Sequence, residues 1–389
     1  MDPAIRLHEW TRSTPMALSE ESLRVLAELR HLIEVRPDGR RWTLRPKGIV
    51  GRLQLREGTL ELLPKHPVAN LCRMLAAVAG VPRLFEPIAA LGDGTLPDLL
   101  MAAFVQRAEA LLTEGLRRDY MERSEPLPVL RGRLDLPAHL RRPEALVTDL
   151  RCRHEDYTLD TPFNAVLRQT AEACHSRWPA IAGRVLRLRH RLTSLSPVRM
   201  RPEEIDRFRY DRLTEPYRPV HALCRWILEG ARLGLGGKPQ APGASFVVEM
   251  APLFERFVSL SLRGRLRPPW RVELQERKAL DRARAIEIRP DVVVYREDRA
   301  VAVIDAKYKL RRSGVPGNAD AYQVLAYAQR YGVRRVWLVY PDQPAGERVL
   351  VTHDGGKEIA SVGLDLGAGW EEVAAGLDEL ATHVRAVDG

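Results

Sequence analysis

Residues 289–308 read RPDVVVYREDRAVAVIDAKY, and this stretch decides the fold of the C-terminal part of the chain. Two valine-rich runs, residues 291–296 and 300–308, flank the polar triplet EDR. Short β-branched runs on either side of a turn signal are typical of strands, so the stretch predicts an antiparallel hairpin. The second run is apolar in its first half and charged in its second half, which is unusual for an interior strand and suggests a function for the charges.

The hairpin geometry brings three of the charged side chains together. If the turn is centred on Asp298, the numbers of paired residues sum to 596, and Asp291 lies directly opposite Asp305. Directly opposed residues share a face of the sheet, with Cβ atoms roughly 5 Å apart. Lys307, two residues beyond Asp305, points to the same face. A shift of one residue in the register would send Asp291 to the other face, so this prediction depends on the turn.

Two facing carboxylates repel each other, and a divalent cation between them removes the repulsion. Hard oxygen ligands suit Mg²⁺, which polarises a phosphoryl oxygen and lowers the pKa of a bound water. We therefore expect Asp291 and Asp305 to bind the metal, with Lys307 orienting the water or stabilising developing charge. Glu255, on the preceding helix, is a candidate for a further carboxylate ligand. The alternative is an ordinary hairpin whose Asp305 and Lys307 emerge into solvent.

Helices are expected on both sides of the hairpin. Before it, a single helix face should be buried through residues at helical spacing, namely Met250, Leu253, Phe254, Phe257 and Val258. After it, residues 319–332 have helical spacing, and Gln323 and Tyr327 share a face because they are four apart. Further strands are predicted at residues 270–274, 284–288 and 335–341.

Composition narrows the class of protein. The chain has 389 residues, 45% of them hydrophobic and 29% charged, and it contains no apolar run long enough to span a membrane. The start, MDPAIRLHEW, lacks a secretory signal, so a cytoplasmic location is expected. Four widely spaced cysteines favour ordinary thiols over a zinc pattern or disulfide framework. The net charge of +10 is concentrated upstream, because from residue 240 onward 22 Lys plus Arg face 21 Asp plus Glu.

The chain is long enough for two or three domains. We predict a β-rich N-terminal domain at residues 1–70, a mainly helical basic region at 71–239 and an α/β domain at 240–389. The glycine- and proline-rich segment 234–245 marks the second boundary. In the middle region, Thr161 and Pro162 are expected to begin a helix, and residues 127–136 are expected to form a strand. The arginine-rich stretch 177–212 is either a solvated helix surface or a phosphate-contacting one.

These motifs resemble two protein families, one within the other. The order of helix with Glu, strand with Asp, strand with Asp-Ala-Lys and helix is similar to the PD-(D/E)XK nuclease superfamily, whose signature pieces match RPD (289–291) and DAK (305–307). QVLAY (323–327) resembles the Gln-x-x-x-Tyr motif of its RecB-like branch. The chain as a whole resembles McrC, the nuclease subunit of McrBC-type modification-dependent restriction systems, through the segments LELLPKHP, LRGRLDL, DTPFNAVL, LFERFV, RPDVVV, IDAKYK and YQVLAYA.

The resemblance implies a multidomain α+β protein whose C-terminal nuclease domain has a mixed sheet flanked by helices. It implies an Mg²⁺-dependent DNA endonuclease subunit in which Gln323 and Tyr327 hold double-stranded, modified DNA beside the metal. It also implies a McrB-like AAA+ GTPase ring as partner, in which the N-terminal part of this chain docks and stimulates hydrolysis. GTP would be bound by that partner, because this chain has no Walker A pattern. The alternatives are a non-catalytic DNA clamp that activates the GTPase and a stand-alone RecB-like repair nuclease.

Overall fold

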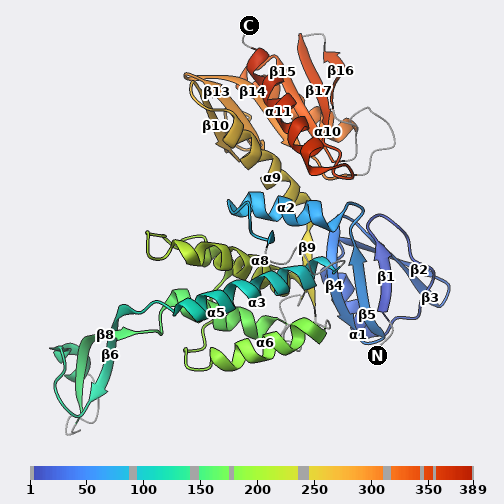
Figure 1. Ribbon diagram of the computed structural model, residues 1–389. Coiled ribbons are helices and arrows are strands. Elements are labelled where there is room, and N and C mark those ends of the chain that lie inside the picture. Colours follow the sequence, from blue (N-terminus) through green and yellow to red (C-terminus); the bar gives the residue numbers. More distant parts are fainter. Residues whose placement is uncertain are drawn as a thin grey trace. The chain divides into compact units, whose positions relative to one another are not determined.

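The structure is a computed structural model that describes residues 4–86, 94–140, 149–174, 179–234, 245–309, 317–341, 346–353 and 356–387. It divides into two compact units (Figure 1). Unit 1 joins Met1–Pro97 to the C-terminal segment Ala244–Gly389, and unit 2 contains Asp98–Ala231. The predicted linker at 234–245 lies outside the described residues apart from its two ends. The division into domains 1–70, 71–239 and 240–389 stays a prediction.

The N-terminal part of unit 1 is a small sheet with a hairpin and two helices. Its elements are β1 (Ala4–His8), α1 (Glu20–Glu28), β2 (Ile33–Asp38), β3 (Arg41–Pro46), β4 (Ile49–Leu55), β5 (Gly58–Leu63), α2 (Val68–Ala79) and β9 (Phe246–Glu249). The sheet has the order β1-β5-β4-β9, so its edge strand comes from far along the chain. Gly51 permits this pairing, because its φ is 141° and a Cβ there would lie 2.1 Å from the carbonyl oxygen of Phe246.

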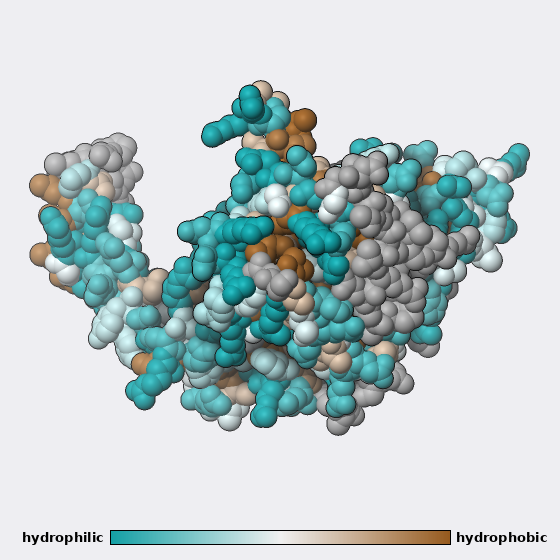
Figure 2. Space-filling model, turned by 90° about the horizontal axis from the view of Figure 1, so that it is seen from above, coloured by the Kyte–Doolittle hydropathy of each residue, from teal (hydrophilic) through white to brown (hydrophobic). Residues whose placement is uncertain are grey.

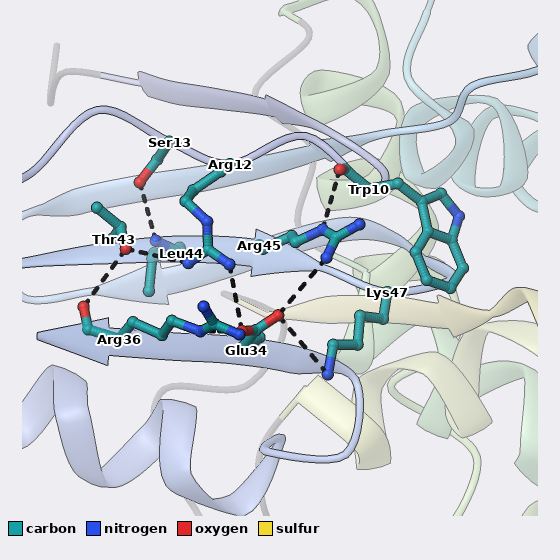
Figure 3. Close-up of polar contacts among 9 residues, drawn as sticks. All are labelled: Trp10, Arg12, Ser13, Glu34, Arg36, Thr43, Leu44, Arg45 and Lys47. Carbon is teal, nitrogen blue, oxygen red and sulfur yellow. Dashed lines mark hydrogen bonds and ion pairs between the residues drawn. The ribbon is translucent and has the colours of Figure 1, made fainter. Parts of the chain in front are cut away.

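On the hairpin of β2 and β3, the carboxylate of Glu34 lies among several cations (Figure 3). Glu34 accepts a hydrogen bond from Arg12 at 3.2 Å and forms ion pairs with Arg36, with Arg45 at 3.8 Å and with Lys47 at 3.8 Å. Burial opposes ionisation of Glu34, but Arg12, Arg36 and Lys47 outweigh it and lower its pKa. The carboxylate therefore stays ionised and this face of the hairpin is cationic.

The C-terminal part of unit 1 is a six-stranded mixed sheet flanked by helices. Its elements are α9 (Met250–Arg265), β10 (Trp270–Leu274), β11 (Lys278–Ala279), β12 (Glu287–Ile288), β13 (Val292–Arg296), β14 (Arg299–Ala306), α10 (Asn318–Tyr331), β15 (Arg335–Tyr340), β16 (Gly346–His353), β17 (Lys357–Gly363) and α11 (Trp370–Ala386). The strand order is β10-β13-β14-β15-β17-β16. The strands β14, β15 and β17 are parallel, and the other pairs are antiparallel. Val324, Tyr327 and Ala328 of α10 pack on one face of this sheet, as its buried core shows.

The register of β13 and β14 contains a β-bulge that was not expected. Next to the two-residue turn, Arg296 pairs with Arg299, and this pairing alone would place Asp291 opposite Ile304. Val301 is an extra residue, so that Val294 pairs with Ala302 and Val292 with Ile304. Away from the turn, from Val292 to Val294, the numbers of paired residues sum to 596, as predicted. The predicted turn centre is wrong by half a residue. The bulge corrects the register.

Unit 2 is helical apart from one three-stranded sheet. Its elements are α3 (Leu96–Glu114), β6 (Asp119–Leu127), β7 (Arg133–Leu134), α4 (Leu136–Leu140), β8 (Leu150–Thr158), α5 (Pro162–Ala173), α6 (Pro179–Arg191), α7 (Pro202–Ile205), the 3₁₀ turn η2 (Glu215–Tyr217) and α8 (Arg218–Gly234). The sheet has the order β6-β8-β7. As predicted, Thr161 caps α5 by accepting a hydrogen bond from the backbone of Asn164, and Pro162 occupies the first turn.

Most of the predicted elements of unit 1 are confirmed, and the errors lie mainly in unit 2. The strand predicted over 127–136 is wrong, because Gly132 turns the chain with a φ of 69° and only two residues of β7 are extended. The long strands β6 and β8 were missed, since their sequences are polar on both faces and give little hydrophobic alternation. Of the strand predicted over 284–288, the structure contains the two residues of β12, Glu287–Ile288.

Some arginines of the arginine-rich stretch 177–212 make contacts within unit 2. Arg184 donates to Glu109 at 2.6 Å, and Arg189 donates to the carbonyl oxygen of Ala171 at 2.7 Å near the end of α5. The four cysteines are buried and free, as expected.

In Figure 2, hydrophilic residues cover most of the visible face and apolar residues form small patches. Among the described helices, none combines the length and the apolar character needed to cross a bilayer.

Candidate active site

Asp291 and Asp305 lie at neighbouring strand ends and are both buried. Asp291 is 6% exposed and directly precedes β13, while Asp305 is 2% exposed and lies near the end of β14. Asp291 accepts a hydrogen bond from the backbone N–H of Ala306 at 2.8 Å through Oδ2, and from Gln275 Nε2 at 2.7 Å through Oδ1. The first of these hydrogen bonds links Asp291 across the hairpin to the backbone of the residue after Asp305.

Lys307 lies against Asp305 on the same side. Its Nζ forms a close ion pair with Asp305 Oδ2, and its backbone N–H donates to the carbonyl oxygen of Val339 on β15 at 2.8 Å. Burial disfavours the ammonium, but Asp305 and Asp291 outweigh this and raise the pKa of Lys307. Lys307 is thus a fixed cation at neutral pH, a group suited to orienting a water or stabilising an anion.

Glu255 belongs to the same electrostatic cluster. It lies on α9 and is half-buried, and the charges that act on its carboxyl include those of Lys307, Asp305 and Arg289. Burial raises the pKa of Glu255, and the Asp305 carboxylate adds to this while Lys307 and Arg289 oppose it. The structure therefore brings all four predicted residues into electrostatic contact from one helix and two strands.

The carboxylates of this cluster disfavour one another in their ionised forms. Burial raises the pKa of Asp291 to about 7, and the charges of Asp305 and Glu255 add to the shift. Burial also raises the pKa of Asp305, against the effect of Lys307. Asp305 Oδ2 is buried and forms its ion pair with Lys307 Nζ. Asp291, Asp305 and Glu255 thus lie close enough to influence one another's ionisation, and carboxylate oxygens are the ligands that a hard divalent cation prefers.

Gln323 and Tyr327 contact each other on α10, close to this cluster. Gln323 Nε2 donates to Tyr327 Oη at 2.8 Å, and Tyr327 Oη donates to the carbonyl oxygen of Arg289 at 3.4 Å. Burial and the negative charge of Asp305 raise the pKa of Tyr327 to about 12, so its hydroxyl remains a donor. This helix face thus presents a polar pair beside the carboxylates.

Sequence reasoning missed several residues around the cluster. Gln275 follows β10 with a φ of 54° and orients Asp291, and nothing in the local sequence marks it. Lys309 pairs with Asp320 at 2.7 Å, which links the chain after β14 to the first turn of α10. The KYK spacing in IDAKYK was the only available signal for Lys309. Residues 310–316, which follow Lys309, lie outside the described residues.

The fold and the cluster together define a class: a multidomain α/β protein whose mixed C-terminal sheet carries converging carboxylates and one lysine at its strand ends. A family model described as McrBC 5-methylcytosine restriction system component matches residues 44–341. The chain belongs to this family.

Two solved structures resemble the chain. A chain in the refined half-complex from the tetradecameric assembly of Thermococcus gammatolerans McrB AAA+ hexamers with bound McrC aligns over 98% of this chain and 100% of its own length, with a TM-score of 0.64 and 17% identity. A chain in the cryo-EM structure of the Thermococcus gammatolerans McrBC complex aligns over 67% of this chain and 87% of its own length, with a TM-score of 0.45 and 17% identity. The first similarity shows a shared fold. No curated protein matches the chain.

Proposed function

We propose that this chain is the nuclease subunit of a McrBC-type restriction system, an Mg²⁺-dependent endonuclease that cleaves phosphodiester bonds of double-stranded, modified DNA. The observation that carries the proposal is the convergence of Asp291, Asp305, Glu255 and Lys307 at one end of the β13–β14 hairpin. Family membership supports the restriction system as its context. We propose a PD-(D/E)XK arrangement for residues 240–389.

Each residue of the cluster has a distinct role in this proposal. Asp291, Asp305 and Glu255 hold the metal ion through carboxylate oxygens. A bound Mg²⁺ supplies a polarised phosphoryl oxygen and a water of lowered pKa. The cationic Lys307 orients the attacking water and stabilises negative charge that develops on the phosphate.

The DNA strand is positioned from α10. Gln323 and Tyr327 offer an amide and a hydroxyl that are already joined by a hydrogen bond, so a phosphate or sugar oxygen meets a rigid pair of polar groups. The excess of positive charge in the first 239 residues, 39 Lys plus Arg against 30 Asp plus Glu, favours approach of a polyanion.

The proposed partner is a ring of McrB-like AAA+ GTPase subunits. This proposal is supported by the solved half-complex with the same fold, which contains McrB AAA+ hexamers with bound McrC. The partner binds GTP, and this chain, through its N-terminal domain at residues 1–70, stimulates the hydrolysis. The absence of a Walker A pattern in the chain is consistent with this division of labour.

The test is cleavage of methylated DNA by the purified pair with GTP and Mg²⁺. We expect Asp305→Ala and Lys307→Ala to reduce cleavage by about 1,000-fold or more, because each removes a group that contacts the reacting atoms. Both variants should still stimulate GTP hydrolysis. Asp298→Ala, in the exposed turn of the same hairpin, and Lys357→Ala, on β17, are the matched controls and should cleave normally.

The outcomes separate this proposal from its alternatives. Cleavage at the wild-type rate by both site variants would refute the assigned roles. Stimulated hydrolysis without DNA breaks in the wild-type reaction would indicate a non-catalytic clamp. Rapid cleavage by the chain alone, without the GTPase, would indicate a stand-alone nuclease.

A further inference from the structure

The sheet of β6, β8 and β7 in unit 2 has almost no apolar core. In the described parts of residues 119–158, the buried side chains are Asp135, Cys152 and His154. Several large apolar side chains of this segment are instead exposed, namely Tyr120, Val129, Leu130, Leu136 and Tyr157. A small sheet without an apolar core needs another source of stability, such as a cross-link.

His154 is the most conspicuous of the buried groups. Its side chain is 2% exposed, and within the described residues neither ring nitrogen has a hydrogen-bond partner. Gly132 packs directly on it, since a Cβ at Gly132 would lie 2.9 Å from His154 Cβ. Burying an imidazole without a partner costs free energy, typically about 1 to 3 kcal/mol, so a ligand for this ring is expected.

Two carboxylates face His154 at a specific separation. His154 Nε2 lies 3.6 Å from Glu125 Oε1 and 3.5 Å from Asp156 Oδ2, and the three atoms all lie within 4.8 Å of one another. These separations are too long for hydrogen bonds. They are close to the spacing of about 3.3 to 3.5 Å between nitrogen and oxygen ligands of one tetrahedral zinc ion. Glu125 is 45% exposed and can rotate to close the remaining gap.

Two arginines contact Asp156, one at each of its carboxylate oxygens. Arg131 holds Asp156 Oδ1 at 2.5 Å, the kind of contact that orients a metal-binding carboxylate from outside. Arg123 approaches Oδ2 at 3.2 Å, but it also contacts Asp160 at 3.6 Å. The carboxylates of Glu125, Asp156 and Asp160 outnumber the guanidinium groups of Arg123 and Arg131, so a cation improves the local charge balance.

We propose that Glu125, His154 and Asp156 bind a zinc ion that cross-links β6 to β8. Zinc is the metal class, because an imidazole nitrogen with carboxylate oxygens suits Zn²⁺ better than Mg²⁺. The ion takes Asp156 Oδ2 and leaves Arg123 to Asp160. It gives the sheet the cohesion that an apolar core provides elsewhere, and it is independent of the proposed nuclease site in unit 1.

The test is calorimetric zinc titration of the full-length chain carrying Asp305→Ala, which weakens metal binding at the proposed nuclease site. We expect one zinc equivalent, unaffected by excess Mg²⁺. Adding His154→Gln should weaken its binding by about 100-fold or more, because it replaces the only nitrogen ligand. Adding His190→Gln, at an exposed position of α6, should leave it unchanged. Absence of zinc binding in the parent chain, or equal binding in the His154→Gln chain, would overturn the proposal.

A second variant addresses the case in which His154→Gln fails to fold. Arg123→Met keeps the aliphatic stem but removes the charge that competes for Asp156 Oδ2, so zinc should bind several-fold more tightly. An ion-pair network without a metal predicts no gain in zinc affinity. Unchanged or weaker binding in Arg123→Met would therefore contradict the placement of the ion at this oxygen.

Co²⁺ added in place of zinc should give the intense visible absorption of tetrahedral coordination. A weak octahedral spectrum would contradict the proposed geometry.

Discussion

At the scale of single residues, the candidate active site consists of buried charges that oppose each other. Asp291 and Asp305 are almost inaccessible, and their main protein cation is Lys307. Residues so placed weaken the fold, because buried like charges repel in a medium that screens them poorly. Natural chains keep such clusters where function requires them. Gln275 and the backbone of Ala306 hold Asp291 in place by hydrogen bonds.

A buried histidine in unit 2 gives a prediction at this scale. His221 has one ring nitrogen 3.1 Å from Tyr210 Oη and the other 2.9 Å from the carbonyl oxygen of Phe163, and aromatic rings surround it. Burial lowers the pKa of His221 to about 4 from the ordinary histidine value of about 6.5. The resulting stability is complete above pH 6.5 and is lost as the pH falls towards 4, because only the unfolded state takes up the proton in this range.

We therefore expect unfolding of the wild-type chain in urea to need less denaturant at pH 5 than at pH 7, with a loss of roughly 2 kcal/mol from this group. His221→Gln should lower stability at pH 7 but show a smaller loss between pH 7 and pH 5. His190→Gln, exposed on α6, is the control and should keep the wild-type pH dependence. An identical pH slope in wild type and His221→Gln would exclude this source of acid sensitivity.

At the scale of elements, the β-bulge in β14 decides whether the site forms. A two-residue turn with a regular ladder would pair Asp291 with Ile304 and turn Asp305 to the opposite face. The extra residue, Val301, restores the register in which the carboxylates face each other. The side chain of Val301 is itself buried, which helps to retain it within the strand. The chemistry of the hairpin thus depends on a bulge that absorbs one residue of β14, because a regular ladder through a strand of the same length would misplace Asp305.

Deletion of Val301 tests this argument. Without the extra residue, a regular ladder continues from the turn and still pairs Val294 with Ala302, so Asp291 remains opposite Asp305. We expect DNA cleavage to persist, with a stability loss of about 1 to 3 kcal/mol from the lost burial. Insertion of one alanine after Val301 should instead abolish cleavage, because the ladder slips by one residue. If the deletion abolished cleavage and the insertion preserved it, the role of the bulge would be disproved.

At the scale of the whole molecule, unit 1 is assembled from the two ends of the chain. The strand β9 completes the N-terminal sheet, and Asn70 of α2 donates to the carbonyl oxygens of Leu366 and Ala368 at 2.9 Å each. Tyr308 Oη, one residue after Lys307, donates to Glu9 at 3.0 Å. The N-terminal part is therefore a structural support of the strand that carries the candidate active site.

This arrangement predicts how fragments behave. A fragment of residues 245–389 exposes the apolar side chains of β9 and the ring of Tyr308, so we expect it to aggregate when expressed alone. Co-expression with residues 1–97 should recover soluble material, and residues 98–231 serve as the control because they lack these contacts. Circular dichroism and sedimentation measure the outcome. A soluble, cooperatively folded 245–389 fragment would show that the C-terminal part needs no N-terminal support.

Local sequence patterns were enough to predict the hairpin and the helices on either side of it. They also predicted that Asp291, Asp305 and Lys307 group together, but from a turn centre that was wrong by half a residue, and the bulge at Val301 compensates for that error. These depend on turn signals and on local periodicity, which act over a few residues. Glu255, Gln323 and Tyr327 were also predicted, through helical spacing and the resemblance to known motifs. Their roles stay predictions.

The bulge at Val301, the contact of Gln275 with Asp291 and the pairing of β9 with β4 become visible in the folded chain alone. The tertiary structure also placed His154 between Glu125 and Asp156 on two strands that the sequence did not reveal. Each of these features joins residues that are distant in the chain or departs from a regular period. A local pattern cannot specify such features, because their energies depend on contacts that exist only after the chain has folded.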